Sequence, residues 1–334
     1  SALYRVALAT RNEIMGTILI GLQEASINGA QRNELARLAP DMKLVVTDDR
    51  ARMRQVLEDV EIAAGWLPPE LVRQMPRLRW YQQWPAGADW LLRHPEAAER
   101  AFILTNTSGL HAIPMTEQVL AYLFAFARRL PDAVRTQGRR EWWAPRGETL
   151  FEVTGKTMLL IGVGAIGAKT AQAAAALGVR VLGVRRDPAE SVAGVARMVG
   201  PDELDKVLPE ADFVVLTVPR TAQTKGMIGE HELRQMKPSA ILINIGRGGT
   251  VDDEALARAL REGWIAGAGL DVFETEPLPA ESPLWEMDNV IITCHYGGAT
   301  PHYNERAMEI FLDNLRRFRA GEPLRNVVDK GRGY

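Results

Sequence analysis

Short apolar runs alternate with longer segments of helical pattern along most of the chain. The runs are rich in Val, Ile and Leu with little polar alternation, which is typical of strands buried on both faces of a parallel sheet. The clearest predicted strands are Thr157–Ile161, Arg180–Val184, Asp212–Thr217, Ala240–Asn244, Gly267–Asp271 and Val290–Thr293, with helices predicted at Ala165–Leu177 and Asp252–Glu262. Weaker runs precede them at Val6–Ala9, Lys43–Val46, Ile62–Ala64, Arg79–Gln82 and Ile103–Asn106. This alternation predicts an α/β protein built on parallel sheets.

Two longer helices are also predicted. Residues Ile113–Leu130 are apolar on more than one face, so this helix is expected to be buried between domains or subunits. Pro114 suits its first turn, and Pro131 is predicted to end it. The second helix spans His302–Arg319 and is rich in arginine.

Length and charge narrow the class of protein. At 334 residues the chain is long enough for two domains. Lys and Arg total 40 and Asp and Glu total 42, so the net charge is -2 and the sequence has no basic stripe of the kind that binds nucleic acid. No segment approaches the roughly 20 apolar residues of a membrane helix, and the N-terminus does not resemble a signal peptide. We therefore expect neither nucleic-acid nor membrane partners.

Cysteine and histidine usage adds two expectations. Cys294 is the only cysteine, so no internal disulfide can form and a reducing, cytoplasmic location is expected. The five histidines are scattered rather than grouped at metal-ligand spacing, so no metal site is predicted.

A glycine-rich motif predicts dinucleotide binding. Residues 162–167 read GVGAIG, directly after one predicted strand and at the start of the next helix. In this context Gly162 makes the tight turn, Gly164 lets the backbone approach a pyrophosphate, and Gly167 lets the helix pack closely on the strand. The helix N-terminus favours the anion. The alternative is a plain tight turn between a strand and a helix.

The strand Arg180–Val184 is expected to end at the ribose of the dinucleotide. An acidic residue there bonds the 2′-hydroxyl of NAD, whereas arginine accommodates the 2′-phosphate of NADP. Arg185 and Arg186 stand at this point, and Asp187 follows them. Guanidinium groups attract phosphate through charge-assisted hydrogen bonds, so the sequence favours NADP(H). In the alternative the arginines are solvated and Asp187 bonds the ribose of NAD(H).

Three chemically capable side chains follow later strands of the same predicted domain. Arg247 lies in NIGRGG, Glu276 in LDVFETEPLP and His295 in TCHYGGATP. Each has an ordinary structural interpretation, as a solvated charge, a turn residue or a structural histidine. Because ligands of open α/β sheets bind beyond the carboxyl ends of the strands, we expect the three to converge on one crevice.

The motifs GVGAIG, NIGRGG, LDVFETEPLP and HYGGAT, in this order and spacing, resemble the D-isomer-specific 2-hydroxyacid dehydrogenase family over nearly the whole chain. The resemblance implies two doubly wound parallel-sheet domains. A Rossmann-type cofactor domain of residues 104–299 is inserted into a flavodoxin-like substrate domain of residues 1–103 and 300–334. It also implies a homodimer formed largely through the inserted domain. Arg185 stands where many relatives have Asp, which makes the chain most similar to the NADPH-dependent glyoxylate/hydroxypyruvate reductases.

The resemblance also implies roles for particular residues. His295 resembles the catalytic acid/base, Glu276 its carboxylate partner and Arg247 the substrate-binding arginine. Histidine suits the proton donor because its ordinary pKa is about 6.5. The stretch WPAGADW (84–90) resembles the substrate-carboxylate loop, so the N–H groups near Ala86 and Gly87 are expected to bind the carboxylate. The implied coenzyme-binding residues are Gly162, Gly164, Ala165, Ile166, Gly167, Arg185, Arg186, Val218, Pro219, Thr224, Ile245, Gly246, Arg247, Asp271, His295, Gly297 and Gly298.

The implied reaction is reduction of a small 2-keto acid, such as glyoxylate or hydroxypyruvate, to the D-2-hydroxy acid by hydride from NADPH, with NAD(H) as a second coenzyme. Trp66 and Trp84 are expected to shape an apolar substrate pocket, and Trp142 and Trp143 to reach a partner subunit; ordinary packing is the alternative for each.

A rival function is a dinucleotide-sensing, corepressor-like binding protein on the same scaffold. Formate oxidation is disfavoured, because formate dehydrogenases of the family typically carry Gln where Glu276 stands.

Overall fold

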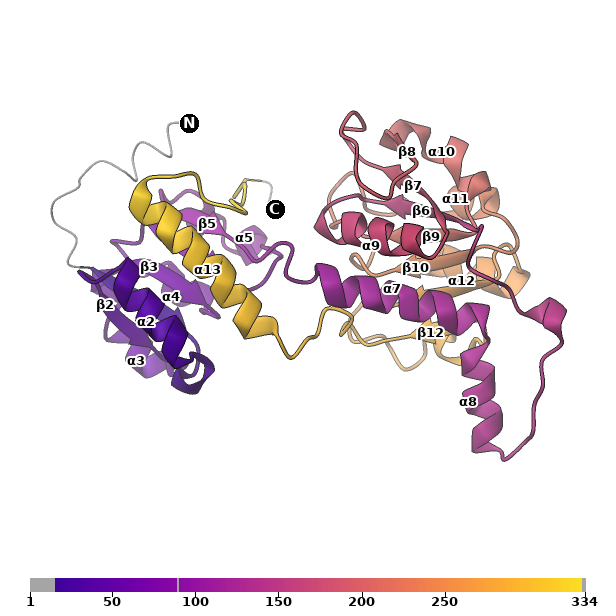
Figure 1. Ribbon diagram of the computed structural model, residues 1–334, viewed down its shortest axis with the longest axis horizontal. Coiled ribbons are helices and arrows are strands. Elements are labelled where there is room, and N and C mark those ends of the chain that lie inside the picture. Colours follow the sequence, from indigo (N-terminus) through magenta and orange to yellow (C-terminus); the bar gives the residue numbers. More distant parts are fainter. Residues whose placement is uncertain (1–15, 89, 332–334) are drawn as a thin grey trace. The chain divides into compact units, whose positions relative to one another are not determined.

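The chain forms two compact units, each built on one sheet of parallel strands (Figure 1). The computed structural model describes residues 16–88 and 90–331. One unit comprises residues 1–110 and 301–334, and the other comprises residues 111–300. Within the described residues the sheets hold five and seven strands, and all strand pairings are parallel. The predicted α/β fold with two parallel sheets is confirmed.

The first sheet has the strand order β2-β1-β3-β4-β5. Its strands are β1 (Thr17–Gly21), β2 (Lys43–Val46), β3 (Val60–Gly65), β4 (Trp80–Gln83) and β5 (Ile103–Thr105). The last four overlap the predicted strands. The predicted strand Val6–Ala9 lies outside the described residues, and β1 is formed by an apolar run that is absent from the prediction.

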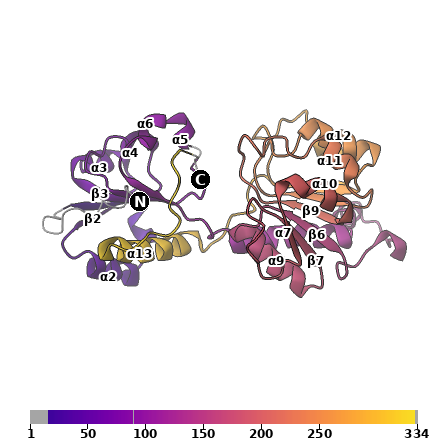
Figure 2. The same ribbon diagram turned by 90° about the horizontal axis from the view of Figure 1, so that it is seen from above.

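Helices cover both faces of the first sheet (Figure 2). They are α2 (Gly29–Leu38), α3 (Arg50–Arg54), α4 (Pro69–Val72), α5 (Trp90–Arg93), α6 (Pro95–Ala98) and α13 (Tyr303–Ala320). Neighbouring strand residues point to opposite faces, so Ile18 packs with α2 and α13 while Leu19 packs with α3 and α4. In α13, Phe311 lies against Trp80 with ring centroids 5.3 Å apart. The last helix of the chain therefore completes a core whose strands come from its first third.

The second sheet has the order β12-β11-β10-β9-β6-β7-β8. Its strands are β6 (Thr157–Ile161), β7 (Arg180–Val184), β8 (Arg197–Val199), β9 (Phe213–Leu216), β10 (Ile241–Asn244), β11 (Gly267–Leu270) and β12 (Val290–Ile292). All except β8 fall within the predicted strands. The chain runs outward from β6 to β8 and then returns to β9 on the other side of β6, so the strand order reverses there. Ligands of open parallel sheets bind at the carboxyl ends of strands beside such a reversal.

Helices also cover both faces of the second sheet, with α7 and α9 on one face and α10, α11 and α12 on the other (Figure 2). The helices of this unit are α7 (Ala112–Ala127), α8 (Leu130–Gly138), α9 (Ala165–Ala176), α10 (Leu204–Val207), α11 (Glu230–Gln235) and α12 (Asp253–Glu262). In the described part of the chain, no helix combines the length and the apolar character needed to cross a membrane.

The structure corrects the predicted helix Ile113–Leu130. The first helix, α7, ends at Ala127, and α8 begins at Leu130 after Arg129 adopts a left-handed φ of 52°. Pro131 therefore lies in the first turn of a new helix, where its missing N–H is not needed, rather than after the end of the old one.

Candidate functional site

The glycine loop follows β6 and leads into α9. Gly162 has a φ of 99°, a conformation that favours glycine, and a Cβ there would lie 2.8 Å from Cγ1 of Val218. A Cβ on Gly167 would lie 2.3 Å from the carbonyl oxygen of Gly162, so helix and loop pack too closely for any side chain. Gly164 faces open space instead: among the residues that the structure describes, nothing lies within 4 Å of an added Cβ and no side chain caps α9. This open space at a helix N-terminus fits a pyrophosphate.

The carboxyl ends of β9 and β10 border the glycine loop. A Cβ on Gly246 would lie 2.6 Å from the carbonyl oxygen of Val218. Ile245 is buried, and its N–H donates to the carbonyl of Leu216, the last residue of β9, at 3.2 Å. The hydroxyl of Thr224 donates to the carbonyl of Pro219 at 2.6 Å. These residues, all expected to bind coenzyme, thus lie in two loops at the edge of the sheet that carries the glycine motif.

Two arginines follow β7 at the same edge. The guanidinium of Arg185 lies 2.8 Å from the carboxylate of Glu190, and the side chain of Arg186 is exposed. Asp187 turns this loop, because its Oδ1 accepts the backbone N–H of Ala189 at 3.2 Å. Two guanidinium groups therefore follow the end of the strand. The first carboxylate after them, that of Asp187, bonds to the backbone of its own loop.

Glu276 and His295 come together beyond two neighbouring strands, β11 and β12. Oε2 of Glu276 lies 2.6 Å from Nδ1 of His295, and Oε1 accepts the backbone N–H of Phe273 at 3.0 Å. The side chains of His295 and Glu276 are 48% and 34% exposed, so a ligand can reach the ring. Because the carboxylate holds Nδ1, Nε2 is the ring nitrogen available to exchange a proton with a ligand.

Arg247 lies in the loop after β10, the strand next to β11. The hydroxyl of Thr250 donates to the carbonyl of Arg247 at 2.7 Å and closes the loop. A Cβ on Gly248 would lie 1.6 Å from the carbonyl oxygen of Phe273, so the arginine loop presses directly on the loop that leads to Glu276. The structure thus brings the predicted arginine, glutamate and histidine to one edge of the sheet.

A buried carboxylate organises the turn that carries the histidine. His295 has a φ of 53°, which is uncommon for a residue other than glycine, and its N–H bonds to the carbonyl of Asp271 at 2.9 Å. Asp271 is 1% exposed, and its carboxylate accepts the Thr293 hydroxyl at 2.5 Å and the N–H of Tyr296 at 3.1 Å. It also accepts the N–H of Gly297. Asp271, expected to bind coenzyme, therefore has a structural task that the sequence motifs do not indicate.

His111, which precedes α7, is a further residue near this edge that the motifs do not mark. Its Nδ1 lies 3.1 Å from the carbonyl oxygen of Gly298. Burial lowers the pKa of His111, the Gly298 carbonyl opposes this shift, and the charge of Arg247 lowers the pKa further; the net shift is downward. No local signal could have found it, because its neighbours lie far along the chain.

In the first unit, the loop after β4 turns its carbonyl groups toward side chains. Gln83 donates to the carbonyl of Gly87 at 2.7 Å, and Asn106 donates to that of Ala86 at 2.7 Å. Among the described residues, no hydrogen bond engages the backbone N–H groups of Ala86 and Gly87. Successive N–H groups of this kind are suited to bind a carboxylate.

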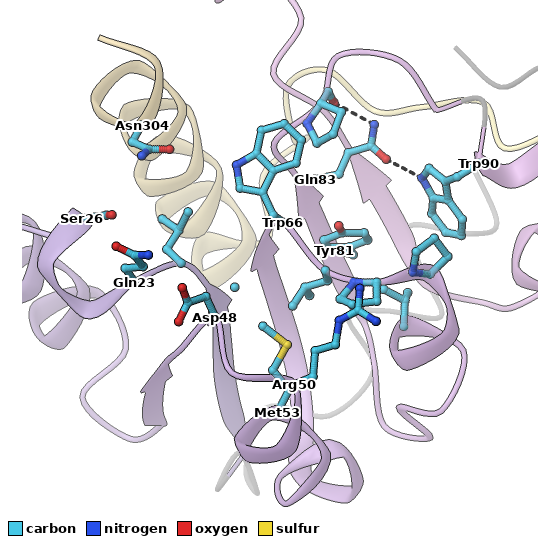
Figure 3. A pocket seen from close by; sticks show the side chains of 17 residues that line it. Gln23, Ser26, Asp48, Arg50, Met53, Trp66, Tyr81, Gln83, Trp90 and Asn304 are labelled. Atoms are coloured by element: carbon cyan, nitrogen blue, oxygen red, sulfur yellow. Dashed lines mark hydrogen bonds between the residues drawn. The ribbon is translucent and has the colours of Figure 1, made fainter. Parts of the chain in front are cut away.

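A pocket of about 720 Å³ opens at the carboxyl ends of β1, β3 and β4 in the same unit (Figure 3). Trp66, 51% exposed, forms part of its wall and stacks on Tyr303 with ring centroids 5.8 Å apart. Asp48 and Arg50 bring opposite charges to the wall. Gln83 also lines it, so the pocket borders the loop described above.

Trp84 does not line this pocket. Its side chain is fully buried, its ring centroid lies 6.2 Å from that of Phe311, and its Nε1 donates to Asn304 at 3.2 Å. Trp84 therefore packs in the core, where the polar atom of its side chain is satisfied. Its expected part in shaping a substrate pocket stays a prediction.

Among the described residues, a group of side chains of types that could bind a metal lies elsewhere, on the surface of the second unit. Ligand atoms of Asp205, His231 and Glu232 all lie within 4.8 Å of one another. Glu232 accepts the N–H of Gly229 at 2.8 Å, and Nε2 of His231 lies 3.3 Å from Asp205. We assign no metal to this group, because its atoms serve local hydrogen bonds.

The chain is similar to known proteins over most of its length. Residues 120–297 match the family model described as D-isomer specific 2-hydroxyacid dehydrogenase, NAD binding domain. A glyoxylate reductase of Korarchaeum cryptofilum is 38% identical over 298 residues, which cover 87% of each protein. A solved D-isomer specific 2-hydroxyacid dehydrogenase family protein from Aeromonas salmonicida has a TM-score of 0.82 at 31% identity, covering 95% of this chain and 99% of that one. An NADPH-dependent glyoxylate/hydroxypyruvate reductase from Sinorhizobium meliloti, solved with NADP and sulfate, has a TM-score of 0.79 at 27% identity, covering 96% and 100%.

Proposed function

Given that this chain belongs to the D-isomer-specific 2-hydroxyacid dehydrogenase family, as its motifs predict, we propose that it reduces a small 2-keto acid to the D-2-hydroxy acid with NADPH. Glyoxylate and hydroxypyruvate are the substrates we favour. The observation that carries the proposal is the contact of 2.6 Å between Nδ1 of His295 and Oε2 of Glu276, at the sheet edge that also holds Arg247.

Three side chains divide the chemical work. Bound NADPH supplies the hydride that reaches the keto carbon. His295 donates the proton from Nε2 to the keto oxygen as the carbonyl bond becomes a single bond. Glu276 orients the ring through Nδ1 and stabilises the cationic imidazole that precedes proton transfer. Arg247 holds the substrate carboxylate with its planar fork and draws electron density toward the keto oxygen.

We assign coenzyme binding to the inserted unit, near the proposed boundaries 104–299. The open space over Gly164 takes the pyrophosphate, and Arg185 and Arg186 take the 2′-phosphate of NADP(H). Two guanidinium groups at the end of β7 support NADP(H) over NAD(H), because a neutral 2′-hydroxyl gains less from them than a phosphate does. NADP was also present in the similar structure from Sinorhizobium meliloti.

We assign substrate recognition to the unit formed by both ends of the chain, within the proposed ranges 1–103 and 300–334. The N–H groups of Ala86 and Gly87 bind the substrate carboxylate in this proposal, and Trp66 borders the substrate side chain. The support comes from the hydrogen bonds of this loop. Gln83 and Asn106 donate to the carbonyl groups of Gly87 and Ala86, not to their N–H groups.

We further propose that two copies of the chain associate through α7, α8 and the segment after them. This part of the second unit exposes large apolar side chains, namely Ile113, Phe124, Leu130, Val134 and Trp142. Trp142 is 99% exposed, whereas Trp143 lies under the guanidinium of Arg129, which is 5.7 Å from the ring centroid. Light scattering on the eluting protein should give twice the mass of one chain, and Val134→Glu should reduce it to the mass of one; a wild-type monomer would contradict the proposal.

One kinetic panel tests the proposed reaction. Glyoxylate, hydroxypyruvate, pyruvate and a bulkier 2-keto acid are each supplied with NADPH and with NADH, and the configuration of the product is determined. We expect turnover of the two small acids, a higher kcat/KM with NADPH and a D product. Tight coenzyme binding without turnover of any keto acid would favour a dinucleotide-sensing protein instead.

A further inference from the structure

The guanidinium of Arg185 is engaged by a carboxylate from its own loop. Nη2 of Arg185 lies 2.8 Å from Oε2 of Glu190, and the turn around Asp187 brings the two together. A 2′-phosphate that binds Arg185 needs the same guanidinium. The carboxylate of Glu190 therefore occupies the partner that the phosphate requires.

We propose that Glu190 is a coenzyme-selectivity residue that competes with the 2′-phosphate of NADP(H) for Arg185; this inference rests on the proposed use of NADP(H). To bind the phosphate, Arg185 has to release Glu190 or share its N–H donors between the phosphate and the Glu190 carboxylate. Two anions bound to one guanidinium lie close together and repel each other. NAD(H) has a neutral 2′-hydroxyl there, which leaves the ion pair intact and can donate to a carboxylate. Glu190 thus lowers the preference for NADP(H) that the two arginines create.

The exposure of the pair sets the size of the effect. The side chains of Arg185 and Glu190 are 33% and 63% exposed, so water screens their attraction and a coenzyme can reach them. Exposed ion pairs of this type change an equilibrium by no more than about fivefold. We therefore expect Glu190→Gln, which keeps the size of the side chain and removes its charge, to tighten NADP⁺ binding by about two- to fivefold. Binding of NAD⁺ should be unchanged or weaker.

Calorimetric titration of the full-length protein tests this without turnover. The ligands are NADP⁺ and NAD⁺, together with adenosine 2′,5′-bisphosphate and AMP, which isolate the 2′-phosphate. The proteins are the wild type, Glu190→Gln, Arg185→Ala and the double variant. The matched control is Glu262→Gln, which also removes an exposed carboxylate bonded to an arginine, at 2.9 Å from Arg258. Glu262 ends α12, which begins beyond the carboxyl end of β10, so it lies toward the opposite edge of the sheet.

The expected pattern is specific. Glu190→Gln tightens NADP⁺ and the bisphosphate but not AMP, Glu262→Gln changes none of the affinities, and the gain disappears when Arg185 is alanine. Equal changes for NADP⁺ and NAD⁺, no change, or weaker NADP⁺ binding in Glu190→Gln would each overturn the inference. If Arg185→Ala weakens NADP⁺ while Glu190→Gln has no effect, only the role of Glu190 fails. If Arg185→Ala also leaves NADP⁺ binding intact, the proposed coenzyme site fails as well.

Discussion

Asp271 holds Gly297 through both of its carboxylate oxygens, with Oδ1 3.2 Å and Oδ2 3.1 Å from the backbone nitrogen of Gly297. Both residues are buried, and the turn between β12 and Gly297 carries His295 in its left-handed conformation. The position of the proposed proton donor is thus fixed by a carboxylate that makes no hydrogen bond to the imidazole ring among the described contacts.

Asp271→Ala should therefore impair both stability and turnover. Its removal leaves buried N–H donors without an acceptor, which costs about 1–3 kcal/mol for each unsatisfied group. Urea unfolding should show the loss of stability, and kcat should fall at temperatures where the variant is still folded. Asp41→Ala, at an exposed ion pair with Arg319, is the control and should change little. Unchanged kcat in folded Asp271→Ala would mean that this turn does not position the histidine.

Substitutions at His295 and Glu276 are expected to lower turnover while leaving coenzyme binding nearly unchanged. His295→Asn should lower kcat by roughly 10²–10⁴-fold, because no proton donor faces the keto oxygen. Glu276→Gln retains the size of the partner but loses its charge, so a smaller loss is expected. In both variants, titration with NADP⁺ should give a Kd within about threefold of the wild type. Near-normal turnover of His295→Asn would refute its role as acid.

Alanine should impair different properties at two glycines of the same motif: coenzyme affinity at Gly164 and stability at Gly167. At Gly164 the added methyl group enters open space, so the fold should persist while coenzyme affinity falls by at least about tenfold, or about 1.4 kcal/mol. At Gly167 the methyl group would lie 2.3 Å from a carbonyl oxygen, so the stability of the protein should fall by about 1–3 kcal/mol or more. Thermal unfolding with and without NADP⁺ distinguishes the two. A Gly164→Ala protein with full coenzyme affinity would place the pyrophosphate elsewhere.

Two tryptophans of the first unit should differ in the same manner. Trp84→Ala opens a cavity in the core and should cost about 3–5 kcal/mol of unfolding free energy. Trp66→Ala removes a half-exposed ring from a pocket wall, so it should change KM and the preference for larger keto acids with much less effect on stability. Identical kinetic constants in Trp66→Ala and the wild type would exclude this wall from substrate recognition.

His111 makes stability depend on pH. Its pKa in the folded protein lies below the ordinary value of 6.5, so the unfolded chain binds a proton more readily. As pH falls through 6.5 toward the lowered pKa, protonation favours unfolding and this part of the stability is lost. His111→Asn keeps a donor for the Gly298 carbonyl and removes the titration. Urea unfolding at pH 7.5 and 5.5 should show a smaller loss on acidification for the variant than for the wild type; equal losses would contradict the assignment.

The sequence predicts the second sheet well because its strands are apolar runs bounded by glycine or polar residues. The predicted and observed bounds of β6 and β7 coincide. The edge strand β8 is missing from the prediction because its apolar run is only two residues long, Met198 and Val199, between Arg197 and Gly200. The break between α7 and α8 is misjudged because Pro131 suits the end of one helix and the start of the next equally well. Only the backbone of Arg129 distinguishes the two.

The motifs likewise identify Arg247, Glu276 and His295, since each follows a recognisable strand. They place Asp271 among the expected coenzyme-binding residues but do not indicate that it holds the turn of His295, and they do not mark His111. Asp271 accepts hydrogen bonds from residues more than twenty positions later in the chain. His111 contacts Gly298, which is separated from it by nearly the whole sequence of the second unit. Relationships of this kind depend on tertiary packing, which no local pattern encodes.

The origin of α13 has a consequence for synthesis of the chain. Residues 111–300 are contiguous and precede α13, so a ribosome synthesises all of the second unit before it makes the helix that covers Trp80 and Trp84. Domains fold as units during synthesis, so the second unit can fold while the first still lacks a layer. During that interval the nascent polypeptide carries an uncovered aromatic surface near its beginning, which is where a chaperone that binds apolar segments would act.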